Sequence, residues 1–241
     1  MTGALRTITL LAGLLGLVAV AQAHPATSTL TQHRLEDRAP AAGADEDGPE
    51  RGAKPSRKAA RVMAVIDALD VERHWPAGVH VNWRTGVPDG GREPTEGRHT
   101  HCSAFVAAAA ERLGVYILRP PEHKQTLLAN AQYDWLADET ARQGWTPLED
   151  GADAQAHANR GWLVLAAYRN HHDDKPGHIV IVRPGEKSAQ AIQAEGPDVT
   201  QAGTVNYQSV AMKIGFSGHP HAFADGEIRF YAHKILKSDL P

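Results

Sequence analysis

Residues 101–106 read His-Cys-Ser-Ala-Phe-Val, and the expected fold follows from this stretch. Cys102 precedes a run of strong helix formers, residues 103–113, which ends at Gly114. Glycine commonly follows the last turn of a helix because it adopts the left-handed conformation at little cost. We therefore expect a helix with the Cys102 thiol at its N-terminus.

The position of Cys102 suggests a chemical role for its thiol. Unpaired backbone N–H groups and the helix dipole stabilise an anion at a helix N-terminus, so the pKa of this thiol is predicted to be lowered. The same N–H groups could receive an oxyanion. The alternative is a buried cysteine acting as a small apolar side chain, since free cysteine is among the most buried residue types.

The first 23 residues are predicted to be a signal peptide. Arg6 precedes an apolar stretch, residues 8–21, and Ala21 and Ala23 give the small-residue pattern of a cleavage site before His24. Nothing later reaches the roughly 18 apolar residues of a membrane span, so no span is expected after cleavage. Retention of this segment as an anchor is the alternative.

Two further segments follow. Residues 24–58 are rich in Ala, Pro, Gly and charged residues and almost lack large apolar ones, which predicts a disordered spacer. Residues 59–241 are long enough for one domain with a sizeable core.

The net charge is −3 with both signs interspersed, which gives no indication of nucleic-acid binding. In a secreted domain, the unpaired Cys102 is either accidental or a nucleophile.

Apolar patterns beyond the cysteine predict helices and strands in a mixed order. Short apolar runs at 162–168 and 178–182, separated by a polar turn, predict neighbouring antiparallel strands, and 228–232 predicts a last strand that closes the sheet. His178 opens the second of these strands directly after Gly177, where an imidazole can act as the base for a thiol. Further helices are expected at 59–71, 126–141 and 152–159, and a long loop at 75–97.

These motifs resemble a known family. Residues 102–106 resemble the nucleophile motif of the NlpC-type and CHAP cell-wall amidases, papain-like cysteine enzymes, and residues 177–182 resemble the Gly-His-apolar strand that carries their histidine. The resemblance implies a papain-like α+β domain with helices packed on one side of an antiparallel sheet. It implies that His178 activates Cys102 to attack an amide of peptidoglycan through an acyl-enzyme.

The resemblance also implies a third polar residue on the next strand that orients the imidazole. Residues 188–195 have a serine cap and helix formers, so we expect a short helix there and the next strand at 198–203. Gln201 then takes the orienting position, through a side-chain carbonyl that accepts the imidazole N–H. If residues 188–195 form a strand instead, Gln193 or Glu195 takes the role.

Two other groups of residues are candidates for the site. Residues 81–86 are similar to the aromatic-Gly stretch that the family places before its cysteine, but the Tyr and the double Gly are missing. Asn82 and Trp83 are therefore candidates for an oxyanion donor or a cleft residue. The alternative is that this segment only supplies an aromatic side chain packed under a long loop. The histidine clusters lack zinc-site spacing, so no metal or other cofactor is expected. These clusters lie at 99–101, 171–174 and 219–221.

The resemblance implies a bacterial enzyme of the periplasm or the secreted fraction that takes the peptide of peptidoglycan as substrate. We expect a monomer, with an inhibitor or immunity protein as a partner to consider. Two alternatives stay open: a papain-like protease or acyltransferase acting on proteins, and a cell-wall binding domain of the same fold that has lost catalysis. The bond cleaved does not follow from the sequence.

Overall fold

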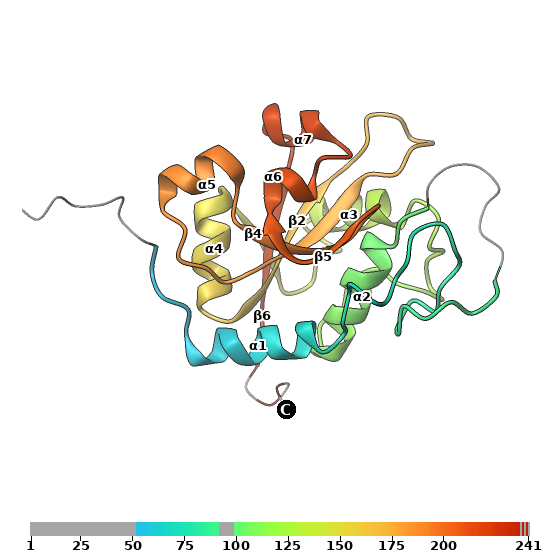
Figure 1. Cartoon of the computed structure of the whole chain (residues 1–241), viewed down its shortest axis with the longest axis horizontal. Coiled ribbons are helices and arrows are strands. Elements are labelled where there is room, and N and C mark those ends of the chain that lie inside the picture. The colour runs from blue at the N-terminus through green and yellow to red at the C-terminus, as the bar shows by residue number, and fades with distance from the viewer. Residues whose placement is uncertain (1–51, 92–98, 237, 239, 241) are drawn as a thin grey trace, which may run out of the picture. The chain divides into compact units, whose positions relative to one another are not determined.

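A computed structural model describes residues 52–91, 99–236, 238 and 240 (Figure 1). These residues form an α+β structure with a six-stranded antiparallel sheet. The predicted signal peptide and most of the predicted spacer, residues 1–51, lie outside the described part, as do residues 92–98 of the long loop.

The sheet has the strand order β1-β6-β2-β3-β4-β5. The central pair, β2 and β3, runs antiparallel with Tyr168 opposite His178, as the two apolar runs predicted. The predicted last strand does not close the sheet, because β6 lies between β1 and β2. The strands are β1 (Trp145–Leu148), β2 (Trp162–Tyr168), β3 (His178–Val182), β4 (Asp198–Ala202), β5 (Asn206–Ala211) and β6 (Arg229–Lys234).

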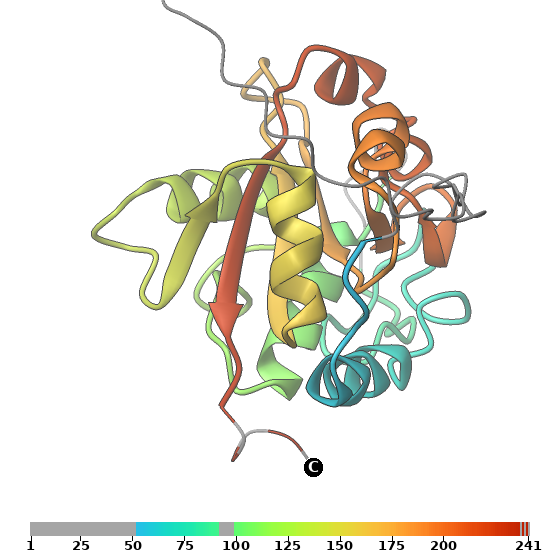
Figure 2. The same cartoon turned by 90° about the vertical axis from the view of Figure 1, so that its left-hand side faces the viewer.

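Helices cover both faces of the sheet, whereas one covered face was expected. One apolar cluster joins α1, α2 and α3 to Ile179 and Ile181, and a second joins α4, α6 and α7 to Val180 and Val182. Figure 2 shows α4 along one face and α2 behind the sheet. Strand β2 is apolar without alternation, the pattern of a strand buried on both faces. The helices are α1 (Arg57–Asp67), α2 (Cys102–Arg112), α3 (Leu128–Ala137), α4 (Gly151–Asn159), α5 (Ala189–Glu195), α6 (Met212–Gly215) and α7 (Pro220–Ala224).

Helix α2 is the most buried helix of the fold. Every residue from Cys102 to Ala110 is buried, and the ring of Phe105 lies edge-on to Trp75 with 5.2 Å between centroids. Alanine side chains let the helix approach its neighbours closely, and it packs against β3, α3 and α1. Gly114 follows the helix with a φ of +68°, as its place in the sequence predicted.

Other predicted elements differ in their ends. Helix α3 is shorter than the predicted 126–141, because Leu127 takes a left-handed conformation and Asp138 is extended. Helix α1 begins at Arg57, after a Ser56 cap that accepts from the Ala59 N–H. The end of the predicted spacer is thus ordered, and the Ser56 N–H donates to the Asn159 carbonyl at 2.9 Å.

The short helix after β3 agrees with its prediction. Ser188 caps α5 by accepting from the Ala191 N–H. Two strands were not predicted: β1 contains Pro147, and β5 has no buried residue. Both lie at the edges of the sheet, where apolar patterning is weak and proline is tolerated.

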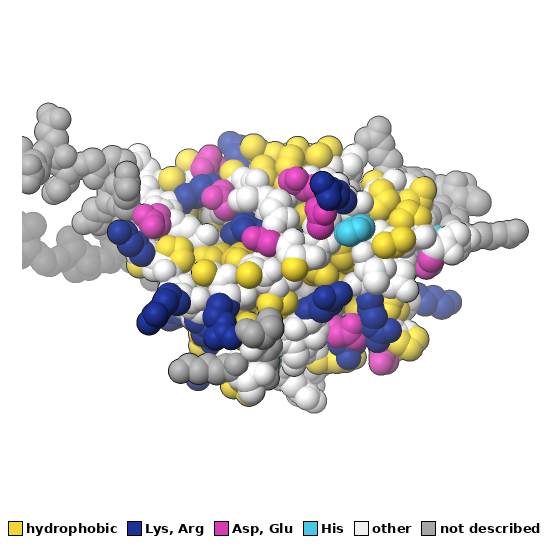
Figure 3. Space-filling model, turned by 60° about the horizontal axis from the view of Figure 1, so that its bottom comes forward, with side chains coloured by type: hydrophobic (Ala, Val, Ile, Leu, Met, Phe, Trp, Pro, Cys, Tyr) yellow, Lys and Arg dark blue, Asp and Glu magenta, His cyan; other side chains and the backbone are white. Residues whose placement is uncertain are grey.

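An ionic network ties α1 to the sheet. The Arg183 guanidinium donates to both carboxylate oxygens of Asp67, at 2.7 and 3.1 Å, and to the Thr200 hydroxyl at 2.8 Å. On the face drawn in Figure 3, acidic and basic side chains are interspersed rather than separated by sign. Within the described residues, no helix is long and apolar enough to cross a membrane.

Candidate active site

Cys102 is the first residue of α2, as predicted, and is 3% exposed. Its sulfur lies close to the backbone N–H groups of Ile179 and Ser103 and to the side chain of Thr100. Burial raises the pKa of the Cys102 thiol, and these donors oppose the rise without reversing it. The predicted lowering is therefore wrong for this structure, because desolvation outweighs the helix N-terminus.

His178 is the first residue of β3 and is held by Gln201. The His178 Nε2 lies 2.7 Å from the Gln201 Oε1. The Gln201 amide nitrogen donates to the Val205 carbonyl at 2.9 Å, so its oxygen faces the imidazole. A carbonyl oxygen can only accept, which places the hydrogen of the neutral ring on Nε2 and leaves Nδ1 as the base.

The His178 ring is buried on the side of α6. Its edge meets the Phe216 ring with 5.0 Å between centroids, and the residue is 6% exposed. Burial lowers the pKa of His178 to about 4, while the Gln201 side chain and the Gly215 backbone favour the charged form. His178 is therefore neutral at neutral pH, as is the Cys102 thiol.

The Cys102 thiol and the His178 ring both lie near the start of β3. The Cys102 sulfur lies by the N–H of Ile179, the residue that follows His178. In the described part of the chain, no hydrogen bond joins this sulfur to the His178 ring. The base is thus the first residue of β3, and the thiol, which belongs to α2, lies by the N–H of the second residue of β3, with no proton-transfer contact between them among the described residues.

The loop before His178 is held by a buried asparagine. The Asn130 Oδ1 accepts from the N–H groups of Gly177, at 2.8 Å, and Asn170, at 3.2 Å. Its amide nitrogen donates to the Lys175 carbonyl at 2.9 Å. Gly177 is required because a Cβ there would overlap the Tyr168 carbonyl oxygen. Asn130 was not among the predicted site residues, although a polar residue between the apolar positions of a helix was a signal.

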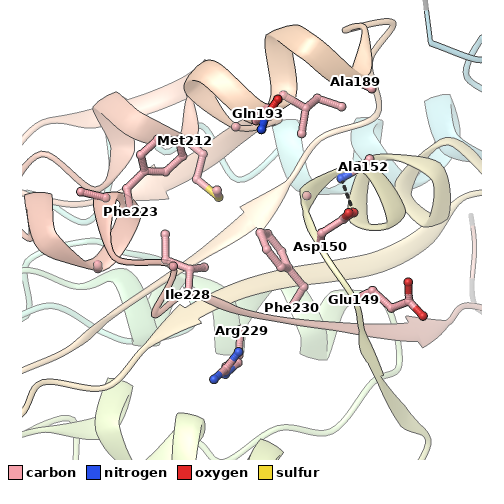
Figure 4. A pocket seen from close by; sticks show the side chains of 16 residues that line it. Glu149, Asp150, Ala152, Ala189, Gln193, Met212, Phe223, Ile228, Arg229 and Phe230 are labelled. Carbon is pink, nitrogen blue, oxygen red and sulfur yellow. Dashed lines mark hydrogen bonds between the residues drawn. The ribbon is translucent and has the colours of Figure 1, made fainter. Parts of the chain in front are cut away.

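The alternatives to Gln201 lie elsewhere. Glu195 forms an ion pair with Lys187 at 2.7 Å. Gln193 lines a pocket of about 640 Å³ between α4, α5, α6 and α7. In Figure 4, Phe223 and Phe230 face this pocket while the Asp150 carboxylate caps the N-terminus of α4. The pocket contains neither Cys102 nor His178.

The other candidate residues of the sequence, Trp83, Asn82 and two of the clustered histidines, make packing, hydrogen-bond and ion-pair contacts. Trp83 is buried in the core beneath the Arg84 guanidinium, 4.5 Å from the ring centroid. The Asn82 Oδ1 accepts from the Arg84 N–H in a turn. Among the histidines of the clusters, His101 bonds the Val79 carbonyl through Nε2 at 2.8 Å, and His171 pairs with Glu227 at 2.8 Å.

Part of the chain is similar in sequence to a known protein. No protein-family model matches the chain. A stretch of 85 residues is 35% identical to a protein of Pseudomonas aeruginosa named peptidoglycan amidase Tse1. The match covers 35% of this chain and 46% of that protein, so the chain spans about half the length of this curated relative. The similarity is partial and shows no family membership for the whole chain.

Proposed function

We propose that the chain is a cysteine hydrolase that cleaves an amide bond of peptidoglycan. The observation that carries this proposal is the bond of 2.7 Å between His178 and Gln201, with the Cys102 sulfur near the N–H of the next residue, Ile179. An oriented base next to a thiol at a helix N-terminus is the arrangement of nucleophilic acyl transfer. The substrate class comes from the partial similarity to a protein named as a peptidoglycan amidase.

The proposed reaction proceeds in two steps. The His178 Nδ1 takes the Cys102 proton as the sulfur attacks the amide carbonyl, and the tetrahedral intermediate expels the amine, which receives that proton. Water, activated by the neutral imidazole, then attacks the thioester, releasing a carboxylic acid and restoring the thiol. The N–H groups of Cys102 and Ser103 at the start of α2 are the proposed oxyanion donors.

Because the thiol and the imidazole are both neutral, the proton is proposed to pass from Cys102 to His178 while the sulfur attacks the substrate. Because burial raises the pKa of Cys102 and lowers that of His178, no thiolate-imidazolium pair forms in advance. We propose that the substrate brings the imidazole into contact with the sulfur, since catalytic hydrogen bonds often tighten only in the substrate complex. The Gln201 carbonyl then stabilises the imidazolium that forms.

The papain-like NlpC or CHAP type of fold, a cleaved signal peptide and a periplasmic or secreted location belong to the same proposal. They follow from the motifs around Cys102 and His178 and from the first 23 residues. Peptidoglycan lies outside the cytoplasmic membrane, so an enzyme acting on it requires export.

The test combines peptidoglycan digestion with thiol labelling. Purified cell wall is incubated with the protein, and released fragments are identified by mass, which also gives the bond cleaved. We expect digestion and labelling by iodoacetamide to be lost in Cys102→Ala, and both to fall in His178→Ala. The matched control is His172→Ala, which changes an exposed histidine of the loop before β3. Undiminished digestion by Cys102→Ala would overturn the proposal.

A cell-wall binding domain without catalysis is the second candidate. It is favoured by the missing bond between Cys102 and His178 among the described residues and by the raised pKa of the thiol. Such a domain would sediment with purified peptidoglycan without releasing fragments, and Cys102 would resist iodoacetamide at neutral pH.

A further inference from the structure

The motif His219-Pro220-His221 places two histidines in different surroundings at the start of α7. His219 is half-buried, and its ring centroid lies 5.2 Å from that of Tyr168 and 6.1 Å from that of His178. The His221 side chain is 85% exposed. From the sequence these histidines were candidates only for metal binding, whereas the fold brings His219 beside the proposed base.

The His219 imidazole is available to a ligand. No hydrogen bond to its ring nitrogens is made by any residue of 52–91 or 99–236, although the residue is partly buried. Burial, and next the proximity of His178, lower the pKa of His219, so the ring is neutral at neutral pH. A neutral imidazole offers one donor and one acceptor, which match the N–H and C=O of a peptide group.

The spacing indicates which part of a substrate would meet His219. Consecutive Cα atoms of a peptide are about 3.8 Å apart, and a hydrogen bond adds about 2.9 Å. Rings whose centroids lie 6.1 Å apart, each reaching one hydrogen bond further, therefore contact groups that are within a few residues of each other along an extended peptide. The Tyr168 ring packs against the His219 ring, with 5.2 Å between centroids, and so limits the directions in which His219 can turn.

We propose that His219 is a substrate-binding residue that hydrogen-bonds a peptide group within a few residues of the scissile amide. The inference rests on the proposed function, because it takes His178 as the base. It assigns the segment between α6 and α7 to recognition of the peptide of peptidoglycan, with Phe216 packing against the base and His219 facing the substrate.

The experiment compares His219→Phe with His221→Phe in the full chain. Phenylalanine keeps a ring against Tyr168 but removes the hydrogen bond, and the exposed His221 is the matched control. Each protein is assayed on soluble peptidoglycan fragments for kcat and KM. Its Cys102 is also titrated with methyl methanethiosulfonate, a thiol reagent that lacks a peptide group. Thermal unfolding confirms that each variant is folded.

We expect His219→Phe to lower kcat/KM about ten-fold or more, mainly through KM, while Cys102 labelling stays within about two-fold of the original chain. His219→Asn, which keeps a donor and an acceptor, should recover part of the loss. Equal losses of turnover and labelling would show that His219 acts through His178, and that would overturn the inference. An unchanged kcat/KM in His219→Phe, or the same loss in His221→Phe, would also overturn it.

Peptidoglycan digestion by the unsubstituted protein distinguishes failure of the proposed function from failure of the His219 assignment. If the original chain releases no peptidoglycan fragments, the proposed function fails and the assignment of His219 fails with it. If it releases fragments and His219→Phe releases them equally well, the proposed function stands and the assignment of His219 alone is wrong.

Discussion

The Gln201 side chain holds His178 in one orientation through a chain of two hydrogen bonds. Its oxygen accepts from the His178 imidazole, and its amide nitrogen donates to Val205. An orienting residue of this kind affects the rate of proton transfer more than substrate affinity, because it stabilises the charged imidazole that exists only during reaction.

Replacing Gln201 by Ala is therefore expected to lower kcat about 10- to 100-fold with little change in KM. Steady-state kinetics on peptidoglycan fragments measure both constants. The matched control is Gln193→Ala, because Gln193 lines the separate pocket between α4 and α5 and should leave kcat unchanged. A loss confined to Gln193→Ala would exclude Gln201 as the orienting residue.

The position of Gln201 was predictable from the sequence, whereas its contact partners were not. Its assignment depended on Ser188 and the helix formers after it, which identified an inserted helix and moved the expected strand to 198–203. The predicted pKa of Cys102 was wrong, because a helix N-terminus can be inferred from local sequence while burial of the sulfur depends on the packing of α2 against β3.

At the scale of elements, α3 positions the start of β3. Asn130 lies on α3 and binds the backbone of Gly177, Asn170 and Lys175, so one side chain fixes the turn that leads into His178. A buried asparagine with all three contacts satisfied stabilises the turn, and its removal leaves buried backbone groups without partners.

We expect Asn130→Ala to lower the free energy of unfolding by about 2 to 4 kcal/mol and to reduce kcat as β3 loses its anchor. Urea unfolding gives the first quantity and kinetics the second. Asn130→Asp keeps the oxygen that accepts from Gly177 but replaces the donor to the Lys175 carbonyl by a second acceptor, so it is expected to be destabilising as well. If Asn130→Ala unfolds at the same urea concentration as the original chain, the anchoring role is wrong.

Elements with a strong local pattern were predicted and edge elements were missed. Strands β2 and β3 agree with their predicted bounds because both are continuous apolar runs. Strand β5 is half-exposed and β1 contains a proline, so neither carries a clear pattern. The pairing of β1 also depends on β6, which is distant in sequence, whereas β5 pairs with its neighbour β4.

At the scale of the whole molecule, the buried neutral His178 makes stability depend on pH. Its pKa is about 4 in the folded protein, against an ordinary value of 6.5. The unfolded chain therefore binds a proton more readily than the folded chain between these values, and protons favour unfolding. The contribution of His178 to the free energy of unfolding is fully present above about pH 6.5 and is lost as the pH drops towards 4.

The free energy of unfolding is expected to decrease by on the order of 1 to 2 kcal/mol from pH 7 to pH 5 through His178. His178→Gln should remove that part of the decrease, whatever its own stability at pH 7. Chemical unfolding at several pH values measures the slope, and His172→Gln, an exposed change, should leave the slope intact. Identical slopes for the original chain and His178→Gln would contradict the assignment.

The sequence by itself determined the local features of this protein: the α2 N-terminus at Cys102, the strand that begins at His178, and the helix that moves the next strand to Gln201. These features follow from propensities and caps within a few residues. The tertiary structure decided what depends on distant contacts: helices on both faces of the sheet, the burial that keeps both the thiol and the imidazole neutral, the bond between His178 and Gln201, and the place of His219 beside the base. The physical reason is that burial and hydrogen-bond partners are set by packing between segments that are remote in the chain.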